Sequence, residues 1–304
     1  MEHPELTYAN HDPAHCLAPG LFQSLPKRSG VCLTLRLTYA YNADTNMEFT
    51  GPALGVVDMR VLQCLLAIAS VSKDNREIIT RDATRAEEIE LRTQLKLNGV
   101  AKAKTIVGVQ AKINVLRNEM GYSDLDSGGA YRATRESVER MCAVAITVQH
   151  TDGKSEGYRL LSTCSSAETG VLHVGFNPRL SVAILAPHKK KSYSRINMQE
   201  VRRLATDSAR LLHQRLHWLP TDGEGRVIKL ETLCNYAWPA AVNENARRAR
   251  RDTLAAALGE LVGVGWHVVK ESPESVRIWR PATARRAIPA LAAEPTTVAA
   301  KAEA

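Results

Sequence analysis

Length, composition and charge set the first limits on what this chain can be. It has 304 residues, 44% of them hydrophobic, and its 40 Lys and Arg against 32 Asp and Glu leave a formal net charge of +8. This hydrophobic content excludes an intrinsically disordered chain, and the length allows two modest domains or one large one. The positive charge suits a polyanionic partner, although many soluble proteins carry as much.

Cysteine usage and hydropathy indicate the compartment. Six cysteines are scattered along the chain without a C-x-x-C pair, which is typical of reduced thiols in a cytosol. The first residues, Met1–Glu5, are polar and acidic, so the sequence predicts no signal peptide. Apolar runs such as Leu62–Ala69 are far shorter than a membrane span. We therefore expect a cytoplasmic protein with no membrane contact.

The first third of the chain shows a few clear elements. Residues 1–30 are rich in Pro and His without a hydrophobic period, and we interpret them as an N-terminal arm. Alternating apolar residues predict a strand over 31–41, and an apolar face at helical spacing predicts a helix over 58–70. The charged segment that follows is ambiguous, with short strands expected around Ile78 and Leu95.

The next segment has the element order of a winged helix. Apolar residues at helical spacing predict a helix over 109–120, and a second helix is expected over 128–142. Strand patterns around an Asp-Gly turn then predict a hairpin over 144–161. A further strand over 171–176 and a short helix over 180–185 complete this half.

The second half repeats this order after a lysine-rich break. The predicted elements are helices over 198–204, 207–219, 231–237 and 245–262, a strand over 226–230 and a hairpin over 266–279. Both halves together predict an α+β fold with two tandem winged-helix domains. Its limits are an N-terminal arm at 1–30, a first winged-helix domain at 31–186, a second at 187–282 and a disordered C-terminal tail at 283–304.

The helix predicted over 245–262 begins with an arginine-rich segment. It holds the candidate DNA-contacting residues Asn245, Arg247, Arg248, Arg250 and Arg251. Arginine can donate two hydrogen bonds at once to guanine, and the N-terminal half of a recognition helix contacts base edges. On a helical wheel, however, Arg247, Arg250 and Arg251 lie near the apolar stripe. The alternative to DNA contact is a solvated, charged helix end.

Basic residues in the first module and in both wings are weaker candidates. Tyr131, Arg132 and Arg135 lie near the start of the helix predicted over 128–142. Lys154 and Lys270 lie in the two predicted hairpins, where a wing contacts phosphates. We expect the first module mainly to position the protein on the DNA backbone.

Two groups of residues resemble metal ligands without satisfying the requirements of a metal site. The first group is His11, Asp12, His15 and Cys16, which we interpret as an N-terminal docking motif because zinc needs four ligands held by a structure. His213 and His217 are four residues apart on one helix but lack the H-E-x-x-H pattern, so a polar helix face is expected. We predict no metal.

Catalytic motifs are also missing from the sequence. It contains no phosphate-binding P-loop and no G-x-S-x-G segment, and its carboxylates form no obvious two-metal cluster. We therefore expect a protein that binds double-stranded DNA in a sequence-specific way, with no enzymatic activity and no cofactor. The enzyme alternative, a relaxase or primase, predicts nicking in the presence of Mg²⁺.

Several longer motifs resemble one known family. They are His11–Phe22, Asp126–Ala130, Glu200–Arg202, Ala209–Leu216 and Thr232–Pro239. In this order they closely resemble the RepC replication initiators of IncQ-type broad-host-range plasmids, over about residues 11–281. The likeness is poorest at 71–105 and in the C-terminal tail.

The resemblance implies functions that the residues alone do not. Such initiators bind tandem repeats called iterons in the plasmid origin, help to open the adjacent AT-rich DNA, and direct loading of the plasmid's replicative helicase. By this likeness Arg248, Arg250 and Arg251 match a basic stretch of the C-terminal recognition helix, and Arg132 matches a basic position in the first one. Arg247 falls at an apolar family position. A homodimer through the first winged-helix domain is a further hypothesis.

The residues leave one alternative of the same chemistry open. A winged-helix transcriptional regulator, such as an autorepressor of its own promoter, would bind DNA with the same helices. The two functions differ in strand opening, which only an initiator promotes.

Overall fold

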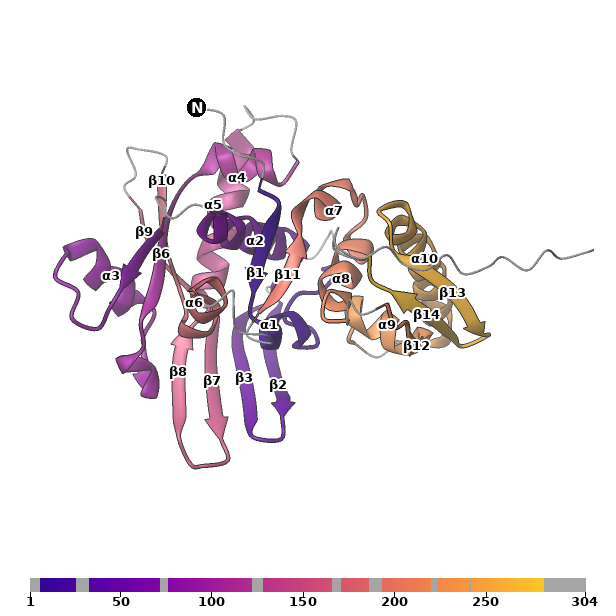
Figure 1. Ribbon diagram of the computed structural model, residues 1–304, viewed down its shortest axis with the longest axis horizontal. Helices are drawn as coiled ribbons and strands as arrows, with labels where there is room; N and C mark the ends of the chain where they lie inside the picture. The colour runs from indigo at the N-terminus through magenta and orange to yellow at the C-terminus, as the bar shows by residue number, and fades with distance from the viewer. Residues whose placement is uncertain are drawn as a thin grey trace, which may run out of the picture.

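The computed structural model describes residues 6–25, 33–71, 76–121, 128–165, 171–185, 193–219, 223–240 and 242–281. The chain has a mixed α+β fold, as predicted, with its first half on one side and its last helices and strands on the other (Figure 1). The predicted domain boundary near residue 186, the turn at 122–127 and the tail at 283–304 lie outside the described residues.

A five-stranded antiparallel sheet forms one part of the first half. Its order is β2 (Thr34–Asn42), β3 (Thr45–Pro52), β7 (Ala145–His150), β8 (Ser155–Arg159) and β5 (Asn98–Gly99). The hairpins β2–β3 and β7–β8 extend together beyond the helices (Figure 1). The sequence analysis missed β3, although its buried Met47 and Phe49 alternate with exposed residues.

A second sheet of the first half has four strands. Its order is β4 (Arg76–Ile79), β6 (Ile106–Lys112), β10 (Val171–Phe176) and β9 (Leu161–Ser165). The prediction of a helix over 109–120 is wrong in its first residues, because β6 continues to Lys112 and α4 (Ile113–Glu119) begins only there. A strand near Leu95 is also wrong, since Leu95 caps the helix α3 (Ala86–Gln94). A short apolar run such as that of β6 fits both the helical and the strand periodicity. Its pairing with β4 and β10 makes it a strand.

Helix α2 (Val56–Val71) is the central helix of the first half. Helices α4, α5 (Gly128–Ala143) and α6 (Pro178–Leu185) pack against it, whereas the one-turn η1 (Val100–Ala103) packs against β8 and β5. Helix α2 is buried on nearly all sides. The carboxylate of its Asp58 accepts hydrogen bonds from the Ser137 hydroxyl at 2.6 Å and the Arg140 guanidinium at 2.7 Å. These contacts fix α5, the first candidate recognition helix, against α2.

The N-terminal segment is part of the fold. Strand β1 (Tyr8–His11) pairs antiparallel with β11 (Ser194–Asn197), and the short helix α1 (Pro13–Leu17) follows. Most of residues 6–25 are buried, so the structure packs the described part of the predicted arm into the core. Strand β11 is the first element of the second half. Its pairing with β1 therefore joins the N-terminal strand of the chain to the second half (Figure 1).

The second half contains the remaining elements. They are the helices α7 (Met198–Arg203), α8 (Asp207–Leu216), α9 (Leu230–Ala237) and α10 (Glu244–Gly263), with the sheet β12 (Arg226–Lys229), β14 (Ser275–Trp279) and β13 (His267–Ser272). Every element predicted here is confirmed to within a few residues. A separate hydrophobic core, which includes Leu212, Leu233 and Trp266, holds α8, α9, α10 and the sheet together, whereas Met198 and Val201 of α7 pack in the core of the first half.

Polar contacts join the two halves. The Gln63 side-chain amide donates to the Gln214 amide oxygen at 2.7 Å, and both side chains are buried. Arg202 donates to the Glu119 carboxylate at 2.9 Å and to the Leu6 carbonyl at 3.2 Å. A buried donor or acceptor that loses its hydrogen-bond partner costs free energy. These hydrogen bonds therefore oppose separation of the two halves.

Candidate nucleic-acid interface

Helices α9 and α10 are consecutive in the second half and pack against each other, which makes them the candidate helix-turn-helix unit. Helix α9 ends at Ala237, with Trp238 as its C-cap. Asn243 caps the start of α10, because its side chain accepts a hydrogen bond from the Ala246 N–H at 3.0 Å. The cap therefore begins the helix immediately before the arginine-rich segment.

The C-terminal part of α10 fixes how the helix is rotated. Leu254, Ala257, Leu258 and Leu261 are buried in the second core. The Glu260 carboxylate also accepts hydrogen bonds from the N–H groups at the start of α8, at 2.6 and 3.1 Å. With about 100° between successive residues, this stripe decides which N-terminal side chains point outward.

Two of the predicted DNA-contacting residues point away from this stripe. Asn245 and Arg248 are exposed, and neither has a hydrogen bond or ion pair to any other part of the chain that the structure describes. A guanidinium and an amide that are free of protein partners keep all their donors for a ligand.

The other three arginines are engaged within the protein. Arg250 donates to the carbonyls of Trp238 at 3.2 Å and Ala240 at 2.7 Å, so it ties α10 to the turn after α9. Arg251 is paired with Glu274 at 2.9 Å, and Arg247 with Glu244 at 3.1 Å. That these three arginines contact DNA bases stays a prediction. Their bonds within the protein would have to break before such a contact could form.

A cavity of about 300 Å³ lies between α9 and α10. Arg247, Arg250 and Arg251 line it together with residues of α9 that include Cys234 and Asn235. The three engaged arginines thus face this side of α10. On the helical wheel, too, these three arginines lie near the apolar stripe.

The candidate wing of the second half is the hairpin β13–β14. Lys270 is exposed on β13, where it can approach a phosphate. Glu274 at the hairpin turn holds Arg251, and sequence reasoning missed this contact. No local pattern marks such a pair, because its members are 23 residues apart.

The candidate residues of the first half lie on α5 and on the β7–β8 turn. Arg132 is exposed, and its ion pair within the described residues is a long one, 3.6 Å to Glu136. Tyr131 and Arg135 are half-buried, and Tyr131 packs against the first core. Lys154 is exposed, and its hydrogen bond to Asp152 raises the pKa of its ammonium group.

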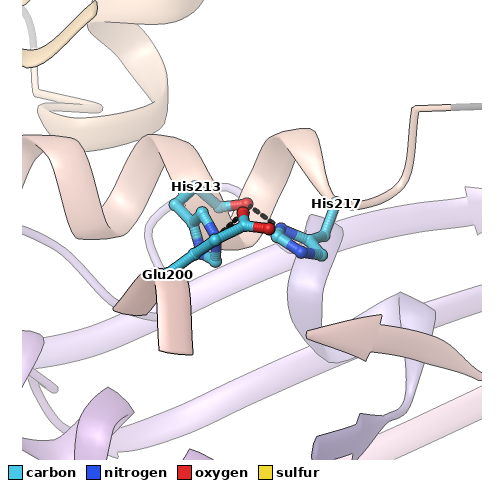
Figure 2. Close-up of side chains that lie close together, drawn as sticks. All are labelled: Glu200, His213 and His217. Carbon is cyan, nitrogen blue, oxygen red and sulfur yellow. Dashed lines mark hydrogen bonds and ion pairs between the residues drawn. The ribbon is translucent and has the colours of Figure 1, made fainter. Parts of the chain in front are cut away.

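His213 and His217 are buried with Glu200, which corrects the predicted polar helix face (Figure 2). His213 Nε2 contacts the Glu200 carboxylate at 2.8 Å, and the Trp266 indole N–H donates to the same oxygen at 2.9 Å. His217 Nδ1 lies 2.9 Å from the His213 carbonyl, and its Nε2 accepts from the Asn197 N–H. The three side chains have metal-ligand spacing, and hydrogen bonds already engage the Glu200 carboxylate, His213 Nε2 and both ring nitrogens of His217.

Burial keeps both histidines neutral. It lowers the pKa of His213 despite the opposing hydrogen bond with Glu200. Burial and the nearby His213 and Arg280 lower the pKa of His217 well below its ordinary value. A neutral imidazole both donates and accepts, as the contacts of His217 require.

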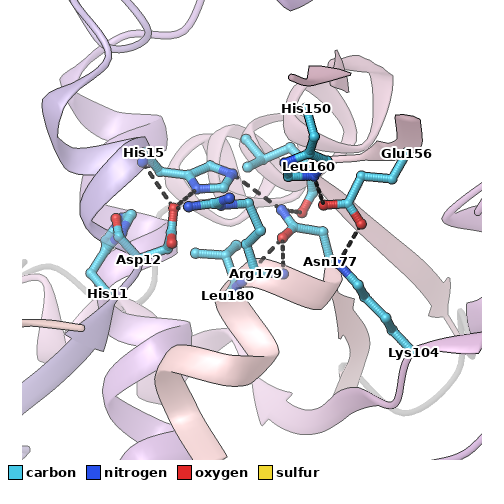
Figure 3. A network of polar contacts seen from close by, with 10 residues as sticks. All are labelled: His11, Asp12, His15, Lys104, His150, Glu156, Leu160, Asn177, Arg179 and Leu180. Carbon is cyan, nitrogen blue, oxygen red and sulfur yellow. Dashed lines mark hydrogen bonds and ion pairs between the residues drawn. The ribbon is translucent and has the colours of Figure 1, made fainter. Parts of the chain in front are cut away.

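The N-terminal group predicted as a docking motif is buried as a polar network (Figure 3). The Asp12 carboxylate contacts His15 Nδ1 at 2.5 Å and accepts from the Arg179 guanidinium at 3.3 Å. Asn177 lies 3.3 Å from His15 Nε2 and also donates to the Leu160 carbonyl. These contacts anchor α1 to α6, as expected of a segment that docks onto the rest of the protein.

Comparison with protein families identifies the chain. Residues 3–282 match the model of Replication protein C (RepC). The chain belongs to the RepC family. This is a family of replication initiator proteins. Comparison with curated protein sequences gives no significant match.

Two solved structures share this fold. Domains 2 and 3 of RctB align with a TM-score of 0.54 at 12% identity, over 88% of this chain and 97% of that one. The Pi initiator protein, solved in complex with iteron DNA, aligns with a TM-score of 0.51 at 14% identity, over 91% and 97%. Among the helices that the structure describes, none has the length and hydrophobicity needed to cross a bilayer.

Acid should destabilise this protein through its buried histidines. Burial and the neighbouring His15 lower the pKa of His11 to about 4, whereas the unfolded chain takes up that proton near pH 6.5. Stability should therefore be complete above this pH and fall as the pH drops from about 6.5 to 4, by roughly 3 kcal/mol for this group. Urea unfolding between about pH 7.5 and pH 4.5 measures the loss.

Two variants test the assignment to His11. His11→Gln should reduce the pH dependence, because one titrating group is removed while His213 and His217 remain. His267→Gln, at an exposed histidine on β13, should keep it. An unfolding midpoint that His11→Gln leaves equally sensitive to acid would contradict the assignment.

Arg250 and Arg248 should differ in what their removal costs. Arg250→Ala removes two hydrogen bonds to carbonyls and should lower the free energy of unfolding by about 1–2 kcal/mol. Arg248→Ala removes an exposed side chain and should change it by less than about 0.5 kcal/mol. Urea unfolding of both variants is the measurement. Equal stabilities would show that Arg250 does not hold the turn.

Proposed function

We propose that this RepC protein is a plasmid replication initiator that binds the iteron repeats of its origin as sequence-specific double-stranded DNA. The family match over residues 3–282 carries the proposal. The fold shared with an initiator that was solved with iteron DNA supports it. So does the exposed, unengaged pair Asn245 and Arg248 on α10.

In this proposal two winged-helix modules bind DNA. The second runs in the order α8, β12, α9, α10, β13 and β14, which is helix, strand, helix, helix and wing. Helix α10 enters the major groove, where Arg248 can bond guanine and Asn245 can bond adenine. Lys270 on the wing contacts a phosphate.

The first module follows the order α4, α5, β7 and β8. Its exposed Arg132 and Lys154 carry positive charge on α5 and on the wing. They contact DNA phosphates and so position the protein on the DNA backbone. Tyr131 and Arg135 support α5 more than they contact DNA, because both are half-buried. Two modules in one chain can enter successive major grooves about 34 Å apart, so one polypeptide binds one iteron.

Origin opening and helicase loading follow from this assignment. An initiator seated on iterons is placed beside the AT-rich segment and presents a surface to the plasmid's replicative helicase. The free protein forms a homodimer through the first module in this hypothesis. Sedimentation with and without iteron DNA tests it, and a monomer at all concentrations would exclude it.

The decisive experiment is footprinting on the cognate origin. A nuclease footprint over direct repeats, together with single-strand reactivity in the adjacent AT-rich DNA, is expected only with protein present. A footprint without single-strand reactivity would instead support the transcriptional regulator. No preference for the origin over unrelated plasmid DNA would refute the proposal.

A variant of α10 tests base contact directly. Arg248→Ala should weaken binding to the iteron by about 1–3 kcal/mol and binding to random duplex by less. Arg81→Ala, at an exposed arginine of the first half, is the matched charge control and should change neither. Equal losses on both duplexes would make Arg248 a phosphate contact. Fluorescence anisotropy at fixed salt gives both affinities.

A further inference from the structure

The outward face of α10 carries an acidic residue in line with Asn245 and Arg248. Asp252 lies four residues after Arg248 and seven after Asn245, so all three share one face of the helix. Asp252 is exposed, on the side opposite the buried Leu254 and Leu258. These three side chains have different hydrogen-bonding capacities, namely an amide, a guanidinium and a carboxylate.

Asp252 is unusual among the acids around α10. Glu244 pairs with Arg247, Glu274 pairs with Arg251, and Glu260 accepts two N–H groups at the start of α8. Asp252 has no hydrogen bond or ion pair within the described chain, although Arg248 lies one turn away.

Its surroundings leave the carboxylate accessible. Ala255 and Ala256 follow on the exposed side of the helix, and Ala249 precedes it. None of these side chains is long enough to hold α10 away from a groove. The carboxylate can therefore approach base edges as closely as Arg248.

A free carboxylate on this face conflicts with general DNA affinity. It repels phosphates at every site, so it weakens binding to any duplex. In the major groove a carboxylate can accept a hydrogen bond only from cytosine N4 or adenine N6. Guanine O6 and N7 and thymine O4 are acceptors and would repel it.

We propose that Asp252 is a specificity-determining residue that accepts a hydrogen bond from the exocyclic amino group of a cytosine or adenine in the iteron. It penalises a guanine or a thymine at that position of the contacted strand, because the major-groove edge of either base offers acceptors and no donor, so it raises discrimination while lowering non-specific affinity. This inference rests on the proposed function, in which α10 enters the major groove.

The test compares the affinities of variants for two duplexes. Asp252→Ala removes both charge and acceptor, and Asp252→Asn removes the charge, keeps one acceptor oxygen and adds an NH2 donor. Glu90→Gln, at an exposed acid on α3, is the matched charge control. Anisotropy at fixed salt gives the dissociation constants for the footprinted repeat and for a scrambled duplex of equal length.

Wild type should prefer the repeat, and Asp252→Ala should reduce this preference by about 10-fold or more. Its affinity for the scrambled duplex should rise. With single base-pair substitutions in the repeat, Asp252→Ala should lose discrimination at one position whose preferred base is cytosine or adenine. Glu90→Gln should keep the wild-type preference. Thermal unfolding controls for folding, and an exposed site should leave it unchanged.

Two results would overturn the inference. An equal rise in affinity for both duplexes would reduce Asp252 to a repulsive charge, and unchanged affinities would give it no role. Failure of the proposed function looks different, because wild type itself would then show no preference for the repeat.

Discussion

Burial of one apolar stripe on α10 determines the geometry of the candidate interface. Leu254, Ala257, Leu258 and Leu261 lie in the second core, and a helix has no freedom to rotate once such a stripe is packed. The arginine-rich segment is thereby divided. Arg248 points outward beside Asn245, while Arg250 is turned inward to the carbonyls of the α9–α10 turn.

The second constraint is the connection between the halves. Strand β1 reaches across the chain to β11, and the buried Gln63–Gln214 bond lies in the same joint. Two DNA-binding modules on one polypeptide gain affinity only if their spacing suits the DNA. A joint made of strand pairing and buried polar bonds limits that spacing.

Buried histidines serve this architecture as hydrogen-bonding groups. His213 and His217 connect α8 to Glu200 on α7 and to Asn197 at the end of β11, and His15 connects α1 to Asp12 and Asn177. Each is neutral or paired where burial would penalise a free charge. Metal-like spacing in the sequence thus has a structural explanation.

The sequence by itself determined the second half almost completely, since its helices carry periodic apolar stripes and three of them, α7, α8 and α10, begin with a side-chain cap, and both signals act locally. It also singled out the arginine-rich helix and the residues that resemble RepC. Only the tertiary structure decided the strand β6, the packing of the N-terminal segment and the separate roles of Arg248, Arg250 and Arg251. These depend on partners distant in the chain, such as β10, β11 and Glu274, and no local pattern specifies a distant partner.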